Sequence, residues 1–193
     1  MPVARTKQTE LAVLCVLGLQ PMTGYAVRAA IRDQLGFFWS ESFGQIYPTL
    51  GELERQGAIE KREGPRPGSS TFALTPLGRE RLESMLAEPD QPVPRRNGLL
   101  LRLFFGRALG PDACRARLER ARDEAQELVE TYRSVRAEIE ADPEYPEHKA
   151  YWLVTVSAGE HTARASVAWA EESLALLESN REAFVLPTGT ERT

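Results

Sequence analysis

A group of uncharged polar side chains lies close together in the sequence, between residues 42 and 57. Gln45 carries an amide that can pair bidentately with adenine, and Thr49 carries a methyl group that can meet the methyl of thymine. The hydroxyl groups of Ser42 and Tyr47 can hydrogen-bond to bases or to phosphate oxygens. We therefore predict DNA contact through Ser42, Gln45, Tyr47 and Thr49, with an ordinary amphipathic surface helix as the alternative.

A single helix is expected to carry these side chains. Ser42 and Gln45 have the spacing of a capping box, in which each side chain satisfies a backbone N–H group of the other residue at a helix start. Gly57 supplies the stop signal. The opposite face carries apolar residues at helical spacing, namely Ile46, Leu50 and Leu53. This pattern leaves the polar side chains facing solvent.

Pro48 lies inside this expected helix, where a proline deletes one backbone hydrogen bond and crowds the carbonyl of Gly44. Either the first turn is loose and the regular helix begins near Tyr47, or Gly44 tolerates a kink. We favour the kink, because it would tilt the first turn towards a groove while Leu50 and Leu53 stay in the core.

The flanking sequence predicts a winged helix-turn-helix. Two helices precede the stretch; the first is capped by Thr9 and the second starts at Thr23. After Gly57 the pattern alternates, which predicts short strands over 58–63 and 70–74, joined by a loop rich in turn-forming residues. Thr75-Pro76 then gives an N-cap followed by proline at the first helical position, and starts a return helix.

The charge is unevenly divided along the chain. The net charge is −4, but residues 1–85 hold 10 Lys and Arg against 9 Asp and Glu, or +1, and the remainder holds 14 against 19, or −5. An excess of one positive charge attracts phosphate only weakly. DNA binding therefore has to rely on locally grouped cations and on dimerisation. Arg66 is one such cation, because its proline-flanked position at the loop tip keeps it exposed, and we predict that it contacts phosphate.

The composition argues against several other classes of protein. At 193 residues with 42% hydrophobic side chains, the chain can build one large or two small domains. It has no run of roughly 18 apolar residues and no signal-peptide order at its start, so we expect a cytoplasmic protein without membrane contact. Cys15 and Cys114 lack CxxC spacing and are expected to be buried free thiols. No metal-ligand cluster, phosphate loop or nucleophile–base pair is evident, so we expect neither a cofactor nor an enzyme.

The second half of the chain predicts an all-helical dimerisation domain over 98–185, preceded by a proline-containing linker over 87–97 and followed by a disordered tail over 186–193. A helix around Leu99 to Phe104 is apolar on most sides and is expected to be buried. Two long helices, separated by a turn over 142–148, are expected to form an antiparallel hairpin whose seam is interrupted at Glu160. The seam predicts these dimerisation residues: Leu118, Leu128, Tyr132, Val135, Val167 and Leu174.

Several motifs resemble the PadR family of bacterial transcriptional regulators, of the type with the larger C-terminal domain. The most specific motif is Ile46-Tyr47-Pro48 with Leu53-Glu54 and Gly57 downstream. The others are Thr23-Gly24-Tyr25, Phe72-x-Leu74-Thr75, the leucine-rich run from Gly98 to Leu109, and Ala150-Tyr151-Trp152-Leu153. The resemblance extends over residues 9–178.

The resemblance also implies roles for further residues. Tyr25, which occupies the family's Gly-Tyr position, would contact phosphate or pack under the linker. Family wings often carry Arg or Lys next to a Tyr, whereas this chain has Ser69 and Ser70, so phosphate contact would shift to these hydroxyl groups. Some relatives bind aromatic compounds near the dimer interface, which makes Trp152 and Trp169 candidates for an effector pocket; simple packing is the alternative.

These features predict a mainly α protein, in which an N-terminal winged helix-turn-helix with a two-stranded β-wing (1–86) precedes the helical dimerisation domain. The predicted function is a sequence-specific transcriptional regulator, most simply a repressor. It would bind a pseudo-palindromic double-stranded DNA operator as a homodimer and be released by a small aromatic effector. A winged-helix module that docks proteins without binding DNA is the alternative.

Overall fold

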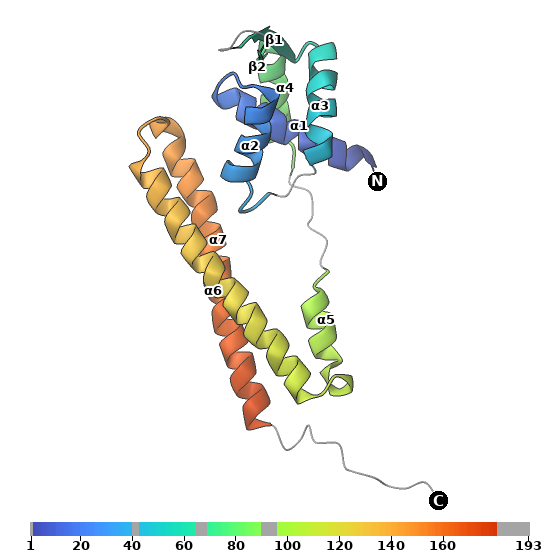
Figure 1. The fold of residues 1–193 in the computed structure, drawn as a ribbon, viewed down its shortest axis with the longest axis vertical. Coiled ribbons are helices and arrows are strands. Elements are labelled where there is room, and N and C mark those ends of the chain that lie inside the picture. Colours follow the sequence, from blue (N-terminus) through green and yellow to red (C-terminus); the bar gives the residue numbers. More distant parts are fainter. Residues whose placement is uncertain (1, 40–42, 65–68, 90–95, 181–193) are drawn as a thin grey trace, which may run out of the picture. The chain divides into compact units, whose positions relative to one another are not determined.

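The computed structural model describes residues 2–39, 43–64, 69–89 and 96–180 (Figure 1). The chain divides into two compact units, with the boundary between Pro92 and Val93. The first unit contains α1 (Pro2–Leu19), α2 (Gly24–Gln34), α3 (Phe43–Arg55), β1 (Ile59–Glu63), β2 (Ser70–Leu74) and α4 (Pro76–Leu86). The second contains α5 (Gly98–Phe104), the 3-10 turn η1 (Gly106–Ala108), α6 (Pro111–Ala141) and α7 (Pro146–Ser179).

The winged helix-turn-helix predicted from the sequence is confirmed. Thr23 caps α2 by accepting a hydrogen bond from the Ala26 N–H at 3.1 Å, and Thr75 caps α4 by accepting one from the Gly78 N–H at 3.1 Å. The two strands pair antiparallel from Ile59 opposite Leu74 to Glu63 opposite Ser70. The local cap and turn signals therefore agree with the global fold, as expected of a sequence that specifies one structure.

The structure corrects two expectations about where helices begin. The first helix begins at Pro2 rather than at Thr9, and the Thr9 side chain is buried inside α1. Proline is well tolerated at the start of a helix, where its missing N–H has no partner in any case. Helix α3 runs without a break from Phe43 through Pro48, so a regular helix that begins only near Tyr47 is wrong. The predicted cap, Ser42, lies outside the described residues.

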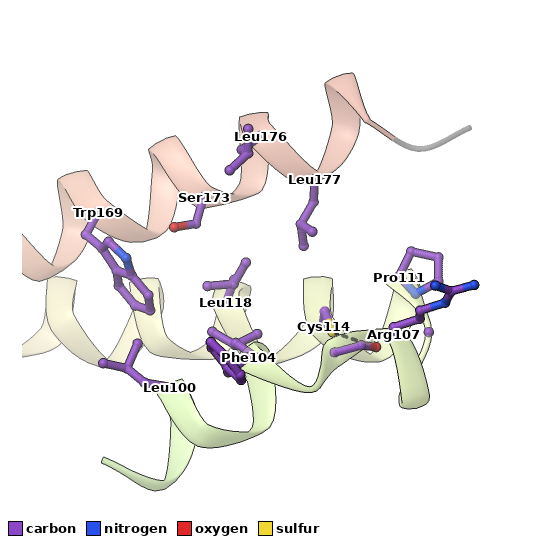
Figure 2. Close-up of a pocket in the computed structure, with 13 residues that line it drawn as sticks. Leu100, Phe104, Arg107, Pro111, Cys114, Leu118, Trp169, Ser173, Leu176 and Leu177 are labelled. Carbon is purple, nitrogen blue, oxygen red and sulfur yellow. Dashed lines mark hydrogen bonds between the residues drawn. The ribbon is translucent and has the colours of Figure 1, made fainter. Parts of the chain in front are cut away.

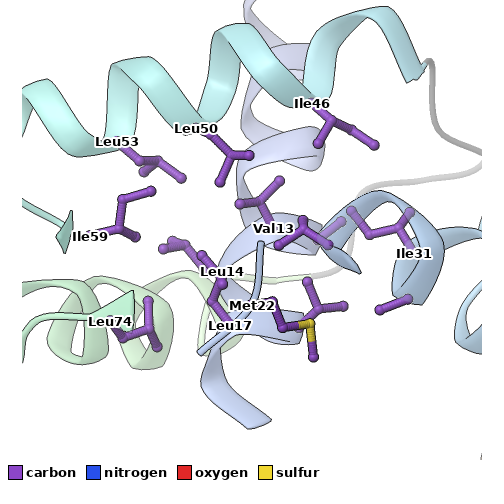
Figure 3. Packing of buried hydrophobic residues seen from close by; sticks show 14 of the residues in the cluster. Val13, Leu14, Leu17, Met22, Ile31, Ile46, Leu50, Leu53, Ile59 and Leu74 are labelled. Atoms are coloured by element: carbon purple, nitrogen blue, oxygen red, sulfur yellow. The ribbon is translucent and has the colours of Figure 1, made fainter. Parts of the chain in front are cut away.

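The core of the first unit fixes α3 in place. Ile46, Leu50 and Leu53 project from α3 towards α1 and are at most 1% exposed (Figure 3). Their partners in the buried cluster include Val13, Leu14 and Leu17 of α1, together with Ile59 and Leu74 of the two strands. Burying an aliphatic side chain of this size contributes about 1.5–3 kcal/mol. The three together hold α3 firmly enough for its opposite face to be presented in one orientation.

In the second unit, α6 and α7 pack against each other as the predicted hairpin, but the seam differs from the prediction in one place. Leu128 is 47% exposed, whereas the next residue, Val129, is buried. A straight α-helix drifts by roughly 20° per heptad relative to a 3.5-residue repeat. Along a long helix the residue that faces the partner helix can therefore shift by one position, and here Val129 rather than Leu128 is buried.

The middle of the hairpin contains a close approach and a buried ion pair. A Cβ atom on Gly159 would lie 2.3 Å from the ring of Tyr132, so only glycine allows the two helices to meet here. Next to it, the buried carboxylate of Glu160 accepts a hydrogen bond from Arg136 Nη2 at 2.9 Å and also pairs with Arg164. The interruption at Glu160 in the sequence pattern is thus a charged contact inside the hairpin.

The Glu160 contact predicts a pH-dependent contribution to stability. The hydrogen bond from Arg136, helped by the charge of Arg164, holds the pKa of Glu160 below its ordinary value. The contribution is present above the pKa of an unfolded glutamate and is lost as the pH falls through the lower pKa of the folded state. Glu160→Gln should therefore lower the free energy of unfolding at pH 7, and the deficit should shrink below about pH 4. Urea titrations of both proteins at stepped pH measure this deficit; one that stays constant would contradict the assignment.

Helix α5 does not fit the prediction of a buried helix. None of its residues is buried, and Leu101, Phe104 and Phe105 are 62%, 83% and 62% exposed. The sequence correctly shows an apolar surface on several sides of this helix. However, α5 is only seven residues long, and only one of its sides faces α6 and α7. The uncovered side of α5 is a large apolar surface, of the kind that marks interaction sites in soluble proteins.

Candidate nucleic-acid interface

The exposed face of α3 is polar at its N-terminal half. Gln45 is exposed, whereas the next residue, Ile46, is fully buried. The amide of Gln45 therefore points away from the core and is held by a helix that the core fixes. This is the geometry that major-groove readout requires, because the helix can enter the groove and set the amide against a base edge.

Tyr47 packs on the first residue of α2. Its ring is 53% exposed, and a Cβ atom on Gly24 would lie 2.8 Å from Tyr47 Cε1. Glycine at position 24 therefore makes room for the ring. Tyr25, the next residue, is 71% exposed. The start of α2 and the first half of α3 thus each present a phenol group to solvent.

Thr49 does not belong to this face. Its side chain is 8% exposed and lies on the buried side of α3 with Leu50. Thr49 is four positions from both Gln45 and Leu53, so the spacing alone allows either side, and its burial places it at the edge of the core with Leu53. The prediction that its methyl group meets a base is therefore corrected.

The wing retains part of the predicted contact set. Ser69 and Ser70 are half-buried, and the Gly64 N–H donates to the Ser69 carbonyl at 2.9 Å, which closes the base of the loop. Arg66, the predicted phosphate contact at the loop tip, lies outside the described residues. The wing strand β1 carries a cation that the sequence prediction missed: Lys61 is exposed, opposite Phe72 of β2. Alternation along β1 could not have identified Lys61, because it places this side chain on the same face as the buried Ile59, and only its charge indicates exposure.

Several cations of this unit are already paired with neighbouring carboxylates. Arg32 pairs with Asp33, Arg55 with Glu52, Arg62 with Glu60 and Arg81 with Glu10. The hydrogen bond from Arg55 lowers the pKa of Glu52, so Glu52 remains ionised at neutral pH. Exposed pairs contribute only about 0.2–1 kcal/mol each. They can therefore be exchanged for phosphate contacts at small cost, although they reduce the attraction of the free protein for DNA.

Trp152 sits in an aromatic cluster at the start of α7. Its ring stacks on His148, with centroids 5.6 Å apart and an interplanar angle of 13°, and Tyr145 meets it edge-on at 5.7 Å. The indole is half-buried in these contacts. The cluster gives Trp152 a packing partner on two sides, which supports the packing alternative for this residue.

The predicted dimerisation residues divide into two groups. Leu118 and Tyr132 are buried inside the hairpin, so neither is available to a second chain, and both are corrected. Val135, Val167 and Leu174 are half-buried, and Leu128 is exposed. Other large apolar side chains of this unit are more exposed than Leu128. They are Leu100, Leu101, Phe104 and Phe105 of α5 and the turn that follows it (98–108, the α5 segment), and Tyr151, Val154 and Leu176 of α7.

Two further properties of the described residues concern membrane spans and metal sites. None of the helices described is long and apolar enough to cross a membrane. In the same part of the chain, no group of three or more His, Cys, Asp or Glu side chains is placed to hold a metal ion.

Two family models match the chain. Residues 13–84 match the transcriptional regulator PadR-like family, and residues 95–178 match the family described as virulence activator alpha C-term. The first match begins within α1, includes α2, α3 and both wing strands, and ends within α4; the second includes α5, α6 and all but the last residue of α7.

Known proteins resemble the chain over most of its length. The negative transcriptional regulator PadR of Bacillus subtilis is 26% identical over 182 residues, which are 88% of this chain and 97% of that protein. Its crystal structure with operator DNA matches with a TM-score of 0.73 at 22% identity, over 87% of this chain and 98% of that one. Its structure with p-coumaric acid matches with a TM-score of 0.72 at 22% identity, over 88% and 98%. The virulence activator AphA of Vibrio cholerae matches with a TM-score of 0.72 at 23% identity, over 89% and 98%. At these identities the structural matches show a shared fold.

Proposed function

Because the chain belongs to the PadR-like family of transcriptional regulators, which are not enzymes, we propose that it binds a pseudo-palindromic operator as a homodimer and acts as a repressor. The observation that carries this proposal is the exposed polar face of α3, set on a helix whose other face is locked in the core. Gln45 would read a base edge, and the hydroxyl groups of Tyr47 and Tyr25 would contact phosphates on either side of the groove.

The wing would supply the remaining backbone contacts. Arg62 of β1 is paired with Glu60, so Lys61 of the same strand and Arg66 in the loop sequence would be the contacting cations, and Ser69 and Ser70 would add hydroxyl donors. Ser42 precedes α3, where backbone N–H groups at the helix start favour phosphate. With so few cations per subunit, two subunits would have to bind together for a firm hold on DNA.

The dimer would form through two apolar surfaces at opposite ends of the helical hairpin. Leu101 and Phe105 are exposed on the α5 segment, and Tyr151 and Val154 are exposed near the start of α7. In a twofold dimer, a contact between two different surfaces occurs twice, because each subunit contributes one copy of each surface. The α5 surface of each copy would therefore cover the α7 surface of the other.

The energies favour using both surfaces. Burying a Leu or Phe side chain contributes about 1.5–3 kcal/mol, so Leu101 and Phe105 of two copies contribute on the order of 6–12 kcal/mol. Association itself costs about 4–15 kcal/mol of translational and rotational freedom. The α5 surfaces alone would roughly offset this cost, and the Tyr151 and Val154 surfaces would supply the net affinity.

Operator release by a small effector completes the proposal. The Bacillus relative is a negative regulator that has been crystallised with p-coumaric acid, which supports repression relieved by an aromatic acid. An effector that prefers one spacing of the two recognition helices would shift the dimer away from the DNA-bound state. We place the protein in the cytoplasm, where its operator would be found.

A gel-shift titration tests the proposal against the alternative of a protein-docking module. The probes are DNA from upstream of the protein's own gene and a scrambled duplex of the same length, each titrated at several salt concentrations. We expect a shift that prefers the upstream DNA and weakens steeply as salt rises, because phosphate contacts release counterions. A protein that shifts neither probe, or shifts both equally, would favour the docking module. Footprinting of the shifted DNA then gives the operator sequence.

A further inference from the structure

A cavity of about 510 Å³ lies between the α5 segment, the start of α6 and the end of α7. Leu100 and Phe104 form one side, Leu118 lies between the helices, and Trp169 closes one end (Figure 2). The volume falls within the range of about 300–1,000 Å³ that small-molecule sites occupy, and the lining is mostly apolar, as in such sites.

The polar groups of this cavity favour an anion. Arg107 of η1 lies at the end away from Trp169, and the hydroxyl of Ser173 projects from α7 between them (Figure 2). In the part of the chain that the structure describes, neither side chain has a hydrogen-bond or ion-pair partner. The lining contains no Asp or Glu, and the nearby Glu178 is paired with Arg115. The cavity therefore carries one positive charge within a half of the chain that is otherwise acidic.

We propose that this cavity binds a hydrophobic monocarboxylate. The guanidinium of Arg107 would hold the carboxylate, because its planar donor fork matches two carboxylate oxygens. The apolar body of the ligand would lie over Leu118 and reach the indole of Trp169, and Ser173 would donate to a second polar group where the ligand has one. The ligand's role as an effector rests on the proposed function, whereas its binding does not.

The cavity is distinct from the proposed dimer surface on the same short segment. Leu100 and Phe104, one helical turn apart, line the cavity, whereas Leu101 and Phe105 do not. The two faces of α5 can therefore be altered separately. A ligand that packs on Leu100 and Phe104 would shift α5, and through it the Leu101 and Phe105 contacts with the second subunit.

Calorimetry with the intact full-length protein tests this site. The probes are p-coumarate, which is aromatic, octanoate, which is aliphatic, and the amide of each acid. We expect at least one acid to bind and its amide to bind at least tenfold more weakly, and Arg107→Gln to weaken acid binding at least tenfold. Arg107→Lys should recover only part of the affinity lost in Arg107→Gln, because it keeps the charge but not the planar donor fork. The ligand should change the fluorescence of wild-type protein and of Trp152→Phe, but not of Trp169→Phe.

Three results would overturn the site: equal affinity for acid and amide, acid binding unaffected by Arg107→Gln, or no binding of either acid. An acid that binds only to monomers would also overturn it, because a second copy would then occupy the cavity in the dimer. A dimer that binds the acid through Arg107 yet holds its operator equally tightly would uphold the site and refute its role in operator release. The operator-binding proposal is tested without ligand and would stand in each case.

Discussion

Replacing Leu101 and Phe105 together by glutamate should convert the dimer into monomers and weaken binding to the full operator by on the order of 100-fold or more. Both side chains are 62% exposed in the single chain, so the charges enter solvent and the subunit should remain folded. In the proposed dimer they would instead face Tyr151 and Val154, where an unpaired charge is costly to bury. Without the partner, each half-site has to be bound independently.

The matched control is Leu86→Glu, because Leu86 of α4 is 61% exposed and belongs to the other compact unit. It should leave both the mass in light scattering and the operator affinity unchanged. Circular dichroism should show the same helical content for all three proteins. A double variant that remains dimeric would place the interface elsewhere on the hairpin. A double variant that is monomeric yet binds the full operator normally would show that dimerisation does not strengthen operator binding.

The sequence predicted those parts of the fold that local rules control. Thr23, Thr75 and Pro76 marked helix starts through capping chemistry, and the change from a helical to an alternating pattern after Gly57 marked the wing. The exposure of α5, which was predicted to be buried, could not be derived from local rules. An apolar pattern says that a surface has to be covered, but it does not say whether the same chain or a second copy covers it.

The candidate site was predictable to a lesser degree. Gln45 and Tyr47 were correctly expected on the exposed side of α3, whereas Thr49 was not, because neighbouring positions on a helix rotate by 100° and polarity alone does not locate the core. The close approach of Tyr132 to Gly159 and the ion pairs of Glu160 depend on how α6 and α7 align. That alignment joins residues far apart in the sequence, and neither helix's own pattern contains it.

Gln45→Ala should remove sequence preference at one base pair of each half-site, with a loss of about 1–3 kcal/mol, or roughly 5- to 150-fold in affinity, for each half-site contact. Alanine is a better helix former than glutamine, and Gln45 is exposed, so the fold should not change. Binding to scrambled DNA should be nearly unaffected, because phosphate contacts supply nonspecific affinity. Competition gel shifts with operator and scrambled duplexes measure both quantities.

Gln34→Ala is the control for this substitution. It makes the same change at an exposed position, in the last turn of α2 and away from the Tyr25 end of that helix. It should alter neither operator affinity nor the preference for operator over scrambled DNA. Equal losses on the two duplexes for Gln45→Ala would assign Gln45 to the backbone rather than to a base.

A base-substitution scan of the footprinted operator shows whether a twofold dimer reads its operator through the exposed face of α3. Each base pair is changed in turn, and binding by wild-type protein and by Gln45→Ala is compared. We expect two symmetric sets of sensitive positions about 34 Å apart, with one position in each set at which Gln45→Ala no longer distinguishes the bases. A single asymmetric set, or sensitive positions that are the same for both proteins, would contradict this expectation.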